Sequence, residues 1–449
     1  MNEAIDWPDF AASLGGVQVE QDRALVRQKS RDFYWYSPVL KDRLRGVSAD
    51  LVAMPRDEAE VIAVLRRCYA AGIAVTPRGG GTGNYGQAMP LHGGVVLDLM
   101  ALNTIHPVSG GTLRVGAGAK LGEIEAACRP QGWELRMFPS TRRTATIGGF
   151  VAGGSGGIGS INFGQLREAG TLLAARVVTM EAEPRVLELR GAEVNRVHHA
   201  YGTNGIITEL TIALAPAQPW IDYVVGFDGF MQLARFTDAV ACADGIAKRL
   251  CSAVDASAAG CFRPLAEVMR AGESLGFFFI AAQSAAAFEE LLAAAGGRIC
   301  RRLSEAEAGD AVPAFEFTWN HTTLQMLKVD RGITYLQTRY PQPDYLATLA
   351  TLNALLGDEV PPHLEFIRVG GAVACAGLPL IRYTTPARLR EIIGIFEAHG
   401  CTVFDPHTYV LEDGGMKQTD RMQLEFKRHA DPRGLLNPGK MRGWGDVKD

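Results

Sequence analysis

A run of closely spaced glycines near the N-terminus is the first place where this sequence could do chemistry. Residues 77–87 read PRGGGTGNYGQ, and GTGNYG at 81–86 fits the pattern GxGxxG. Glycine lets the backbone approach a ligand closely, and consecutive N–H groups in a loop bind a phosphate anion. Such a loop either opens a helix, as in a doubly wound dinucleotide-binding fold, or forms an anion-binding nest between strands. The elements that follow the loop decide between these two interpretations.

Two histidines have the residue type and the setting of a general base. His321 lies in TWNHTTLQMLK and His407 lies in VFDPHTYVLEDGG, each a polar stretch within apolar sequence. Imidazole titrates near neutral pH, which suits the removal of a hydroxyl proton. Each histidine also has a structural interpretation, because His321 can cap a helix beginning near Thr322 and His407 can be a turn residue bonded to Asp405. The sequence leaves both interpretations open.

Arginines that interrupt apolar runs are candidates for binding an anionic substrate. Arg339 lies in ITYLQTRY, Arg368 in LEFIRV and Arg382 in PLIRY. A guanidinium group binds a carboxylate through two parallel hydrogen bonds, so we expect Arg339 and Arg368 to form a substrate clamp. The alternative is that each arginine lies on a solvated strand face.

The composition excludes several classes of partner. The chain has 449 residues, of which 47% are apolar, and a net charge of −4, which suits two or three domains with sizeable cores. No block of lysine and arginine suggests a nucleic-acid or membrane surface. The sequence shows no signal peptide, no stretch that would span a bilayer and no zinc-like spacing among its eight cysteines. We therefore expect a cytoplasmic protein with free thiols.

The elements around the glycine run favour the anion-binding nest. A helix is predicted over 57–71, since Asp57 suits the N-cap, apolar residues recur at helical spacing and Gly72 ends the pattern. A short strand over 73–76 precedes the glycine run, and a buried strand over 95–99 follows it. A doubly wound fold would need a helix directly after the loop. The loop is therefore predicted to hold a phosphate between strands.

The pattern changes after about residue 220, where strand-like and helix-like pieces alternate. The predicted strands cover 222–227, 276–281, 333–340, 364–369 and 378–383, and the predicted helices cover 230–249, 285–295, 345–356 and 386–399. This order predicts an α+β unit in which helices cover one face of an antiparallel sheet. The segment 215–219, APAQP, is the expected boundary before it.

Four blocks of sequence together resemble one known family. They are PRGGGTGNYGQ at 77–87, FPSTRRTATIGGFVAGGSGG at 138–157 with FGQLREAGTLLAARVV at 163–178, YGTNGIITELTIALAP at 201–216, and DPRGLLNPGKM at 431–441. Their order and spacing resemble the FAD-linked oxidases and dehydrogenases of the vanillyl-alcohol-oxidase type, which carry a PCMH-type FAD-binding domain. The nearest branch is that of bacterial dehydrogenases of 2-hydroxy acids such as glycolate and D-lactate.

The resemblance implies an α+β fold with a two-part FAD-binding domain and an inserted α+β cap domain. The FAD-binding domain would cover 1–216, the substrate or cap domain 217–406, and the C-terminal tail 407–449 would return to the first domain. The glycine loop would hold the FAD pyrophosphate. The expected cofactor-binding residues are Pro77, Arg78, Gly79, Gly80, Gly81, Thr82, Gly83, Asn84, Gln87, Pro139, Ser140, Thr146, Ile147, Gly148, Gly149, Gly153, Gly156, Gly157, Gly205, Ile206, Ile207 and Asn437.

The resemblance also implies a reaction, in which a CH–OH group is oxidised by hydride transfer to flavin N5. The expected substrate is a small 2-hydroxy acid, and a dehydrogenase is favoured over an oxidase. The alternatives are a carbohydrate or alditol oxidase of the same fold and a non-catalytic flavin-binding electron-transfer subunit. The electron acceptor, the stereochemistry of the substrate and the oligomeric state do not follow from the sequence.

Two departures from relatives refine these expectations. Many relatives attach FAD through a histidine in the glycine loop, whereas this loop has Asn84 and Tyr85, and His92 lies beyond it. We therefore expect FAD to be bound without a covalent link. Some relatives hold a divalent metal through paired histidines and a glutamate; the nearest pattern here is His407 with Glu412, which is better interpreted as a turn, so we expect no catalytic metal.

Overall fold

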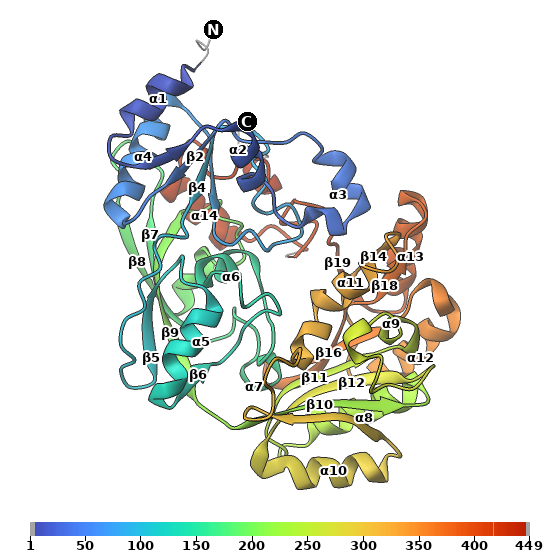
Figure 1. The fold of residues 1–449 in the computed structure, drawn as a ribbon. Coiled ribbons are helices and arrows are strands. Elements are labelled where there is room, and N and C mark those ends of the chain that lie inside the picture. The colour runs from blue at the N-terminus through green and yellow to red at the C-terminus, as the bar shows by residue number, and fades with distance from the viewer. Residues whose placement is uncertain (1–4, 416, 446–449) are drawn as a thin grey trace.

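The computed structural model describes residues 5–415 and 417–445, and it contains three main β-sheets (Figure 1). The first two sheets are formed by residues before 217, and the third is formed by residues after 219. Several short helices lie outside these sheets. They are α1 (Trp7–Ser13), α2 (Arg23–Lys29), α3 (Pro38–Arg43), α7 (Ser160–Phe163), α9 (Ala256–Ala259) and α15 (Arg442–Gly445).

The first sheet presents the glycine loop. Its strand order is β1 (Gln18–Glu20), β2 (Leu51–Met54), β4 (Val95–Asp98) and β3 (Val75–Arg78), and β4 pairs in parallel with both β2 and β3. Helix α4 (Glu58–Ala71) connects β2 to β3. As predicted, Asp57 caps this helix by accepting from the Glu60 amide, and Gly72 ends it with a φ of +69°.

The order of elements after β3 confirms the predicted strand. The glycine loop leaves the end of β3 and the chain then enters β4, with no helix between them. The loop is therefore not the phosphate-binding turn of a doubly wound fold, in which a helix begins directly after the glycines.

The second sheet is antiparallel and lies beside the first. Its order is β5 (Thr112–Gly116), β9 (Ile206–Pro216), β7 (Leu172–Val178) and β8 (Val186–Arg190), and β6 (Trp133–Leu135) also pairs with β9. Two helices pack against this sheet, α5 (Leu121–Cys128) and α6 (Ile147–Gly153). Their apolar side chains and one face of the sheet share a core, which fixes the position of α6.

The third sheet has eight strands, and it confirms the predicted antiparallel sheet with helices. The order is β13 (Arg298–Ser304), β10 (Trp220–Phe227), β12 (Ser274–Ala281), β11 (Lys248–Val254), β16 (His363–Val369), β17 (Ala372–Gly377), β15 (Gln337–Arg339) and β19 (Thr402–Phe404). Four helices pack on one face, namely α8 (Phe230–Cys242), α10 (Ala285–Ala294), α12 (Tyr345–Leu356) and α13 (Pro386–Ala398). The other face packs against the N-terminal half and against α11 (Asn320–Leu327).

Some predicted element bounds were wrong. The predicted helix over 230–249 ends at Cys242, and Lys248 already belongs to β11. All seven residues of β11 are buried, including Lys248 and Arg249, so the strand shows no alternation of apolar and polar residues. The predicted strand over 333–340 is divided at Leu336 into β14 (Ile333–Tyr335) and β15, and β14 pairs with β18 (Leu380–Arg382) in a separate two-stranded sheet.

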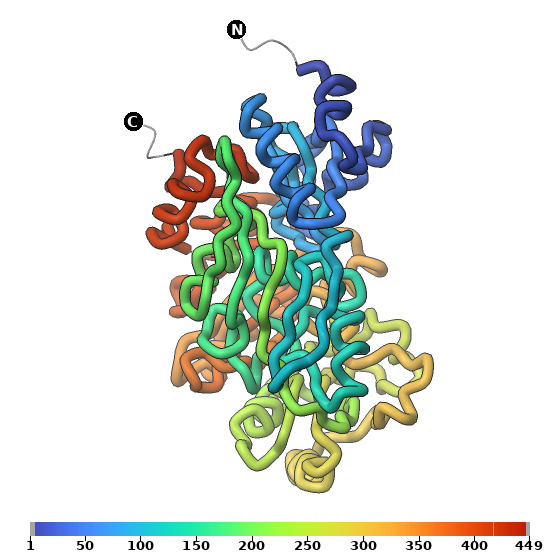
Figure 2. Tube along the Cα trace, turned by 90° about the vertical axis from the view of Figure 1, so that its left-hand side faces the viewer, coloured from blue at the N-terminus to red at the C-terminus, as the bar shows by residue number. Residues whose placement is uncertain are grey.

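The C-terminal segment packs against the first two sheets. Helix α14 (Arg421–Ala430) lies beside strands of the second sheet (Figure 2). Beyond it, the Val75 amide donates to the Leu435 carbonyl at 2.8 Å, and the Asn437 amide donates to the Val75 carbonyl at 2.8 Å. Leu436 is fully buried in the core of the first sheet. The tail therefore supports β3, the strand from which the glycine loop emerges.

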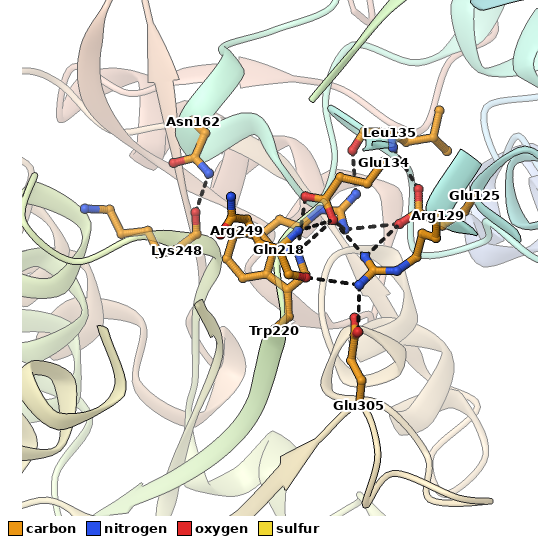
Figure 3. A network of polar contacts seen from close by, with 10 residues as sticks. All are labelled: Glu125, Arg129, Glu134, Leu135, Asn162, Gln218, Trp220, Lys248, Arg249 and Glu305. Atoms are coloured by element: carbon orange, nitrogen blue, oxygen red, sulfur yellow. Dashed lines mark hydrogen bonds and ion pairs between the residues drawn. The ribbon is translucent and has the colours of Figure 1, made fainter. Parts of the chain in front are cut away.

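A buried charge network joins the third sheet to the second (Figure 3). Arg249 of β11 donates to Glu125 of α5 at 3.2 Å and lies 3.4 Å from the Glu134 carboxylate of β6. Glu134 also accepts from the Trp220 indole and pairs with Arg129 at 2.8 Å. Burial raises the pKa of Glu134, and Arg249 opposes that rise. The network fixes the two halves of the molecule relative to each other.

Candidate active site

A large cavity lies where the three sheets meet. Its volume is about 770 Å³, within the range of roughly 300–1,000 Å³ that is common for small-molecule and cofactor sites. The glycine loop and the N-terminal end of α6 form part of its wall, and strands β15 and β16 contribute Arg339 and Ile367 from the third sheet. The cavity is therefore bounded by both the N-terminal half and the unit predicted to be the cap.

The glycine loop presents unpaired backbone amides to this cavity. Residues 79–84 all line it, and among the described residues none of their N–H groups donates an intramolecular hydrogen bond. Backbone amides in proteins nearly always have a partner, so six consecutive free ones point to a ligand. Gly81 has a φ of +63°, which bends the loop into a concave nest. This loop fits a diphosphate group.

One cation supports the same nest. The Arg78 guanidinium lies under the loop, so that a Cβ atom on Gly81 would lie only 2.0 Å from its Nη2 atom. Its Nη1 atom donates to the Arg31 carbonyl at 2.6 Å, which holds the group in place. Burial lowers the pKa of Arg78, while Asp98 and Asp32 raise it, but an arginine remains charged at neutral pH. The nest therefore combines amide dipoles with one positive charge.

The second wall of the cavity is the backbone around α6. Thr146 caps this seven-residue helix by accepting from the Gly149 amide at 3.2 Å, and the Gly148 amide donates to the Ala117 carbonyl at 2.8 Å. A Cβ on Gly148 would lie 2.6 Å from the Ala117 Cβ, so only glycine fits there. The sequence interpretation missed this helix because three of its seven residues are glycine.

Most of the predicted cofactor-binding residues line the cavity. Those that do are Pro77, Arg78, Gly79, Gly80, Gly81, Thr82, Gly83, Asn84, Gln87, Pro139, Ser140, Thr146, Gly148, Gly149, Gly153, Gly156, Gly205 and Ile207. The structure places the other four elsewhere. Ile147 and Ile206 are buried in apolar cores, and the Gly157 amide donates to the Ser160 hydroxyl. Asn437 donates to the Gln87 and Tyr201 carbonyls, so it supports the loop from behind.

His321 lies at the cavity and is paired with a carboxylate that sequence reasoning missed. Its Nδ1 atom is 2.7 Å from Glu316, and both residues line the cavity. Burial opposes ionisation of Glu316, but the neighbouring His321, with Arg143 and Arg142, outweighs it and leaves the carboxyl pKa below its ordinary value. A carboxylate at Nδ1 orients the imidazole and leaves Nε2 to exchange a proton. This pair has the composition of a general base with its orienting group.

Arg339 lies on β15 and also lines the cavity. In the part of the chain that the structure describes, its guanidinium forms no hydrogen bond or ion pair. Gln337, two residues earlier on the same strand, lines the cavity as well. A half-buried guanidinium without a protein partner is suited to bind a carboxylate.

The structure does not bring His407 and Arg368 to the cavity. His407 is fully enclosed, and its ring nitrogens lie 2.7 Å from the Ser37 hydroxyl and 3.0 Å from the Tyr335 carbonyl. Its amide donates to Asp405, which is the turn interpretation that the sequence left open, and burial lowers its pKa. Arg368 donates to the Ile161 carbonyl and pairs with Asp244. Both side chains are therefore occupied by structural contacts.

Neither a metal-binding cluster nor a membrane-spanning helix occurs among the described residues. No group of three or more His, Cys, Asp and Glu side chains in residues 5–415 and 417–445 is arranged to hold a metal ion. The expectation that no metal takes part stays a prediction. Within the same residues, no helix has both the length and the apolar character needed to cross a bilayer.

The part of the chain that matches a known family model includes the glycine loop and α6, which line the cavity. Residues 49–188 match a family model described as an FAD binding domain. A D-2-hydroxyglutarate dehydrogenase of Xanthomonas citri pv. viticola is 34% identical over 197 residues, which are 40% of this chain and 41% of that protein. A D-lactate dehydrogenase of Archaeoglobus fulgidus is 29% identical over 182 residues, which are 38% of this chain and 40% of that protein.

A third relative and a solved structure extend these matches. The glycolate oxidase subunit GlcD of Escherichia coli strain K12 is 30% identical over 177 residues, which are 38% of this chain and 35% of that protein. The chain thus spans about two fifths or less of the length of these relatives. An alkyldihydroxyacetonephosphate synthase structure has a TM-score of 0.75 at 16% identity, covering 98% of this chain and 86% of that one. At this identity the likeness shows the fold alone.

Proposed function

We propose that this chain, which contains an FAD-binding domain over residues 49–188, is a dehydrogenase that oxidises the CH–OH group of a small 2-hydroxy acid. One observation carries the proposal: a single cavity is lined by the free amides of residues 79–84, by the His321–Glu316 pair and by the unpaired Arg339. These features supply a place for the cofactor, a base for the hydroxyl proton and a cation for the substrate carboxylate.

The amides of residues 79–84 and Arg78 would hold the FAD diphosphate. Thr146 and the bare backbone of Gly149 would lie along the rest of the cofactor. When bound, FAD would supply the acceptor for the hydride, a proton with two electrons, that leaves the substrate carbon. Because residues 79–84 contain no histidine and His92 does not line the cavity, we propose that FAD binds without a covalent link.

The substrate is bound and deprotonated by residues of the third sheet and of α11. Arg339 receives the substrate carboxylate, which orients the neighbouring carbinol carbon. His321 accepts the hydroxyl proton at Nε2, and Glu316 at Nδ1 stabilises the resulting imidazolium. The substrate carbon loses one hydride and its hydroxyl loses one proton, so the product is a 2-oxo acid.

Anaerobic mixing of the FAD-loaded protein with a panel of 2-hydroxy acids tests the proposal. We expect the flavin absorption band to bleach with at least one D-2-hydroxy acid and not with sugars or alditols. Replacing His321 by Ala should lower the bleaching rate constant by about 10²–10⁴-fold, the usual contribution of a general base. Bleaching by a sugar alone would instead assign a carbohydrate oxidase.

A second candidate is a flavin-binding subunit of a larger redox complex. The specific observation in its favour is that one relative is itself a subunit, the glycolate oxidase subunit GlcD of Escherichia coli. Purification of the chain from its native cells distinguishes the two candidates. Copurification with an iron–sulfur protein, together with no turnover by the isolated chain, would support the subunit.

A further inference from the structure

The corner between residues 314 and 321 carries an unusual backbone conformation. Trp319, which lies just before α11, has a φ of +52° and a ψ of −140°. These angles lie close to a region of φ/ψ space that almost only glycine occupies. A bulky aromatic residue adopts them only where the surrounding structure enforces them. Residues in such strained conformations concentrate at functional sites.

A buried carboxylate holds Trp319 in this conformation. Glu365 lies on β16, near the middle of the eight-stranded sheet, and is 1% exposed. Its Oε1 atom accepts from the Trp319 amide at 2.7 Å and from the Ser252 hydroxyl at 3.0 Å, and it lies 2.9 Å from Nε2 of His363. A carboxylate bond to a backbone N–H is charge-assisted and therefore strong. It ties the corner to an inner strand of the eight-stranded sheet.

Four residues of this corner line the cavity, and the apolar ones pack into the core. Glu316, Trp319, Asn320 and His321 line it, whereas Glu365 does not. A Cβ on Gly156 would lie 3.6 Å from the Trp319 indole, so the ring reaches the glycine segment of the N-terminal half. The Trp319 Nε1 and Asn320 Oδ1 atoms are buried without a partner among the described residues. Buried polar atoms without partners are rare in proteins and indicate contact with a ligand.

We propose that Glu365 is a positioning residue for the active site, acting through the Trp319 amide. It fixes the backbone turn that directs the Trp319 indole N–H and the Asn320 side-chain amide towards the ligand. The same turn holds His321 beside Glu316. This role rests on the proposed function, because it assigns His321 as the base. Glu365 itself contacts neither the substrate nor the cofactor.

Three substitutions of Glu365 and one control test the role. Glu365→Ala removes the acceptor, and Glu365→Asp keeps the charge but shortens the side chain by one methylene, out of reach of the Trp319 amide. Glu365→Gln keeps an oxygen at the same reach. The control, Ser252→Ala, removes another hydrogen bond to the same carboxylate and leaves the Trp319 contact in place.

We expect the Ala and Asp variants to lose about 10²-fold in the flavin reduction rate constant, since a displacement of about 1 Å in an active site has this effect. Their FAD affinity should stay close to that of the wild type, because the amides of residues 79–84 and Arg78 would hold the diphosphate. Their substrate KM should rise by no more than about tenfold, the effect of losing one neutral hydrogen bond, because Arg339 would still bind the carboxylate. The Gln variant and the Ser252→Ala control should keep rates within about tenfold. If Glu365 only stabilised the fold, its substitutions would not lower kcat more than they raise KM. The Glu365→Gln and Glu365→Asp variants would then also have similar rates.

Full reduction rates in both Glu365→Ala and Glu365→Asp would overturn the inference. If the Ala variant does not fold, the comparison of Asp with Gln decides. Crystal structures of the FAD-loaded wild type and Asp variant separate this inference from the proposed function, because they apply even if no hydroxy acid reduces the flavin. The inference predicts a negative φ at residue 319 in the Asp variant, and an unchanged positive φ would contradict it.

Discussion

Replacing Gly80 by Ala is the sharpest test of how the glycine loop binds its ligand. A Cβ at this position would lie 2.1 Å from the Thr144 carbonyl oxygen and 3.0 Å from its carbon. Thr144 is itself fixed, since its amide donates to the Thr141 carbonyl at 2.9 Å. Two backbone segments therefore meet without room for a methyl group, and the loop must move by on the order of 1 Å to relieve the overlap.

The expected loss of FAD affinity follows from the number of backbone amides that are displaced from the diphosphate. A hydrogen bond to a charged group contributes about 1.5–3 kcal/mol, so losing two amide contacts to a diphosphate weakens binding by about 3–6 kcal/mol. This corresponds to a rise of roughly 10²–10⁴-fold in the Kd for FAD. The Kd is measured by titrating the apoprotein with FAD and following quenching of flavin fluorescence.

Gly16→Ala is the matched control, because a Cβ on Gly16 meets no atom within 4 Å and its φ is not in the left-handed region. It should bind FAD as the wild type does. Folding of both variants is checked by their melting temperatures without FAD. A Gly80→Ala protein that folds and binds FAD within about threefold of wild type would refute the assignment of the loop.

Three further predictions concern stability and cofactor attachment. Arg249→Leu removes a buried cation beside Glu125 and Glu134 and should lower the free energy of unfolding, measured in urea, by about 3 kcal/mol. The loss should be smaller in mild acid, because burial raises the pKa of Glu134 and favours its neutral form. A loss under about 1 kcal/mol would be inconsistent with the network. Burial lowers the pKa of His198 to about 3, so below pH 6.5 the unfolded chain binds a proton that the folded protein does not. The free energy of unfolding should therefore decrease as the pH falls from 6.5 towards 3. Between pH 7 and 5 the loss should be about 2 kcal/mol, and His198→Gln should weaken this pH dependence. Acid precipitation should leave the flavin in the supernatant; yellow colour in the protein pellet would show a covalent link.

The fold was predictable where local sequence and tertiary packing agree. The helix ending at Gly72 shows both capping signals and an apolar stripe, and the structure uses all of them. Strand β11 was missed because burial on both faces removes the alternation that marks a strand. Lys248 and Arg249 resemble the exposed end of a helix. In the structure Lys248 donates to the nearby Ala243 carbonyl, and Arg249 donates to the distant Glu125, which makes their burial possible.

The cofactor side of the site was more predictable than the substrate side. The glycines around the loop are local signals, because close approach of backbone requires that residue type at each position. The corner at Trp319 carries no such signal, since its positive φ is imposed by Glu365, which lies on β16 and is distant in sequence. For the same reason the sequence could not distinguish His321, which pairs with Glu316 at the cavity, from His407, which is enclosed by Ser37.

A crystal structure of the FAD-loaded protein tests the central claim most directly. The claim predicts that the diphosphate accepts hydrogen bonds from the amides of residues 79–84, with Arg78 beneath them and the flavin ring facing His321. A diphosphate bound elsewhere, or a folded protein that takes up no FAD at all, would contradict it.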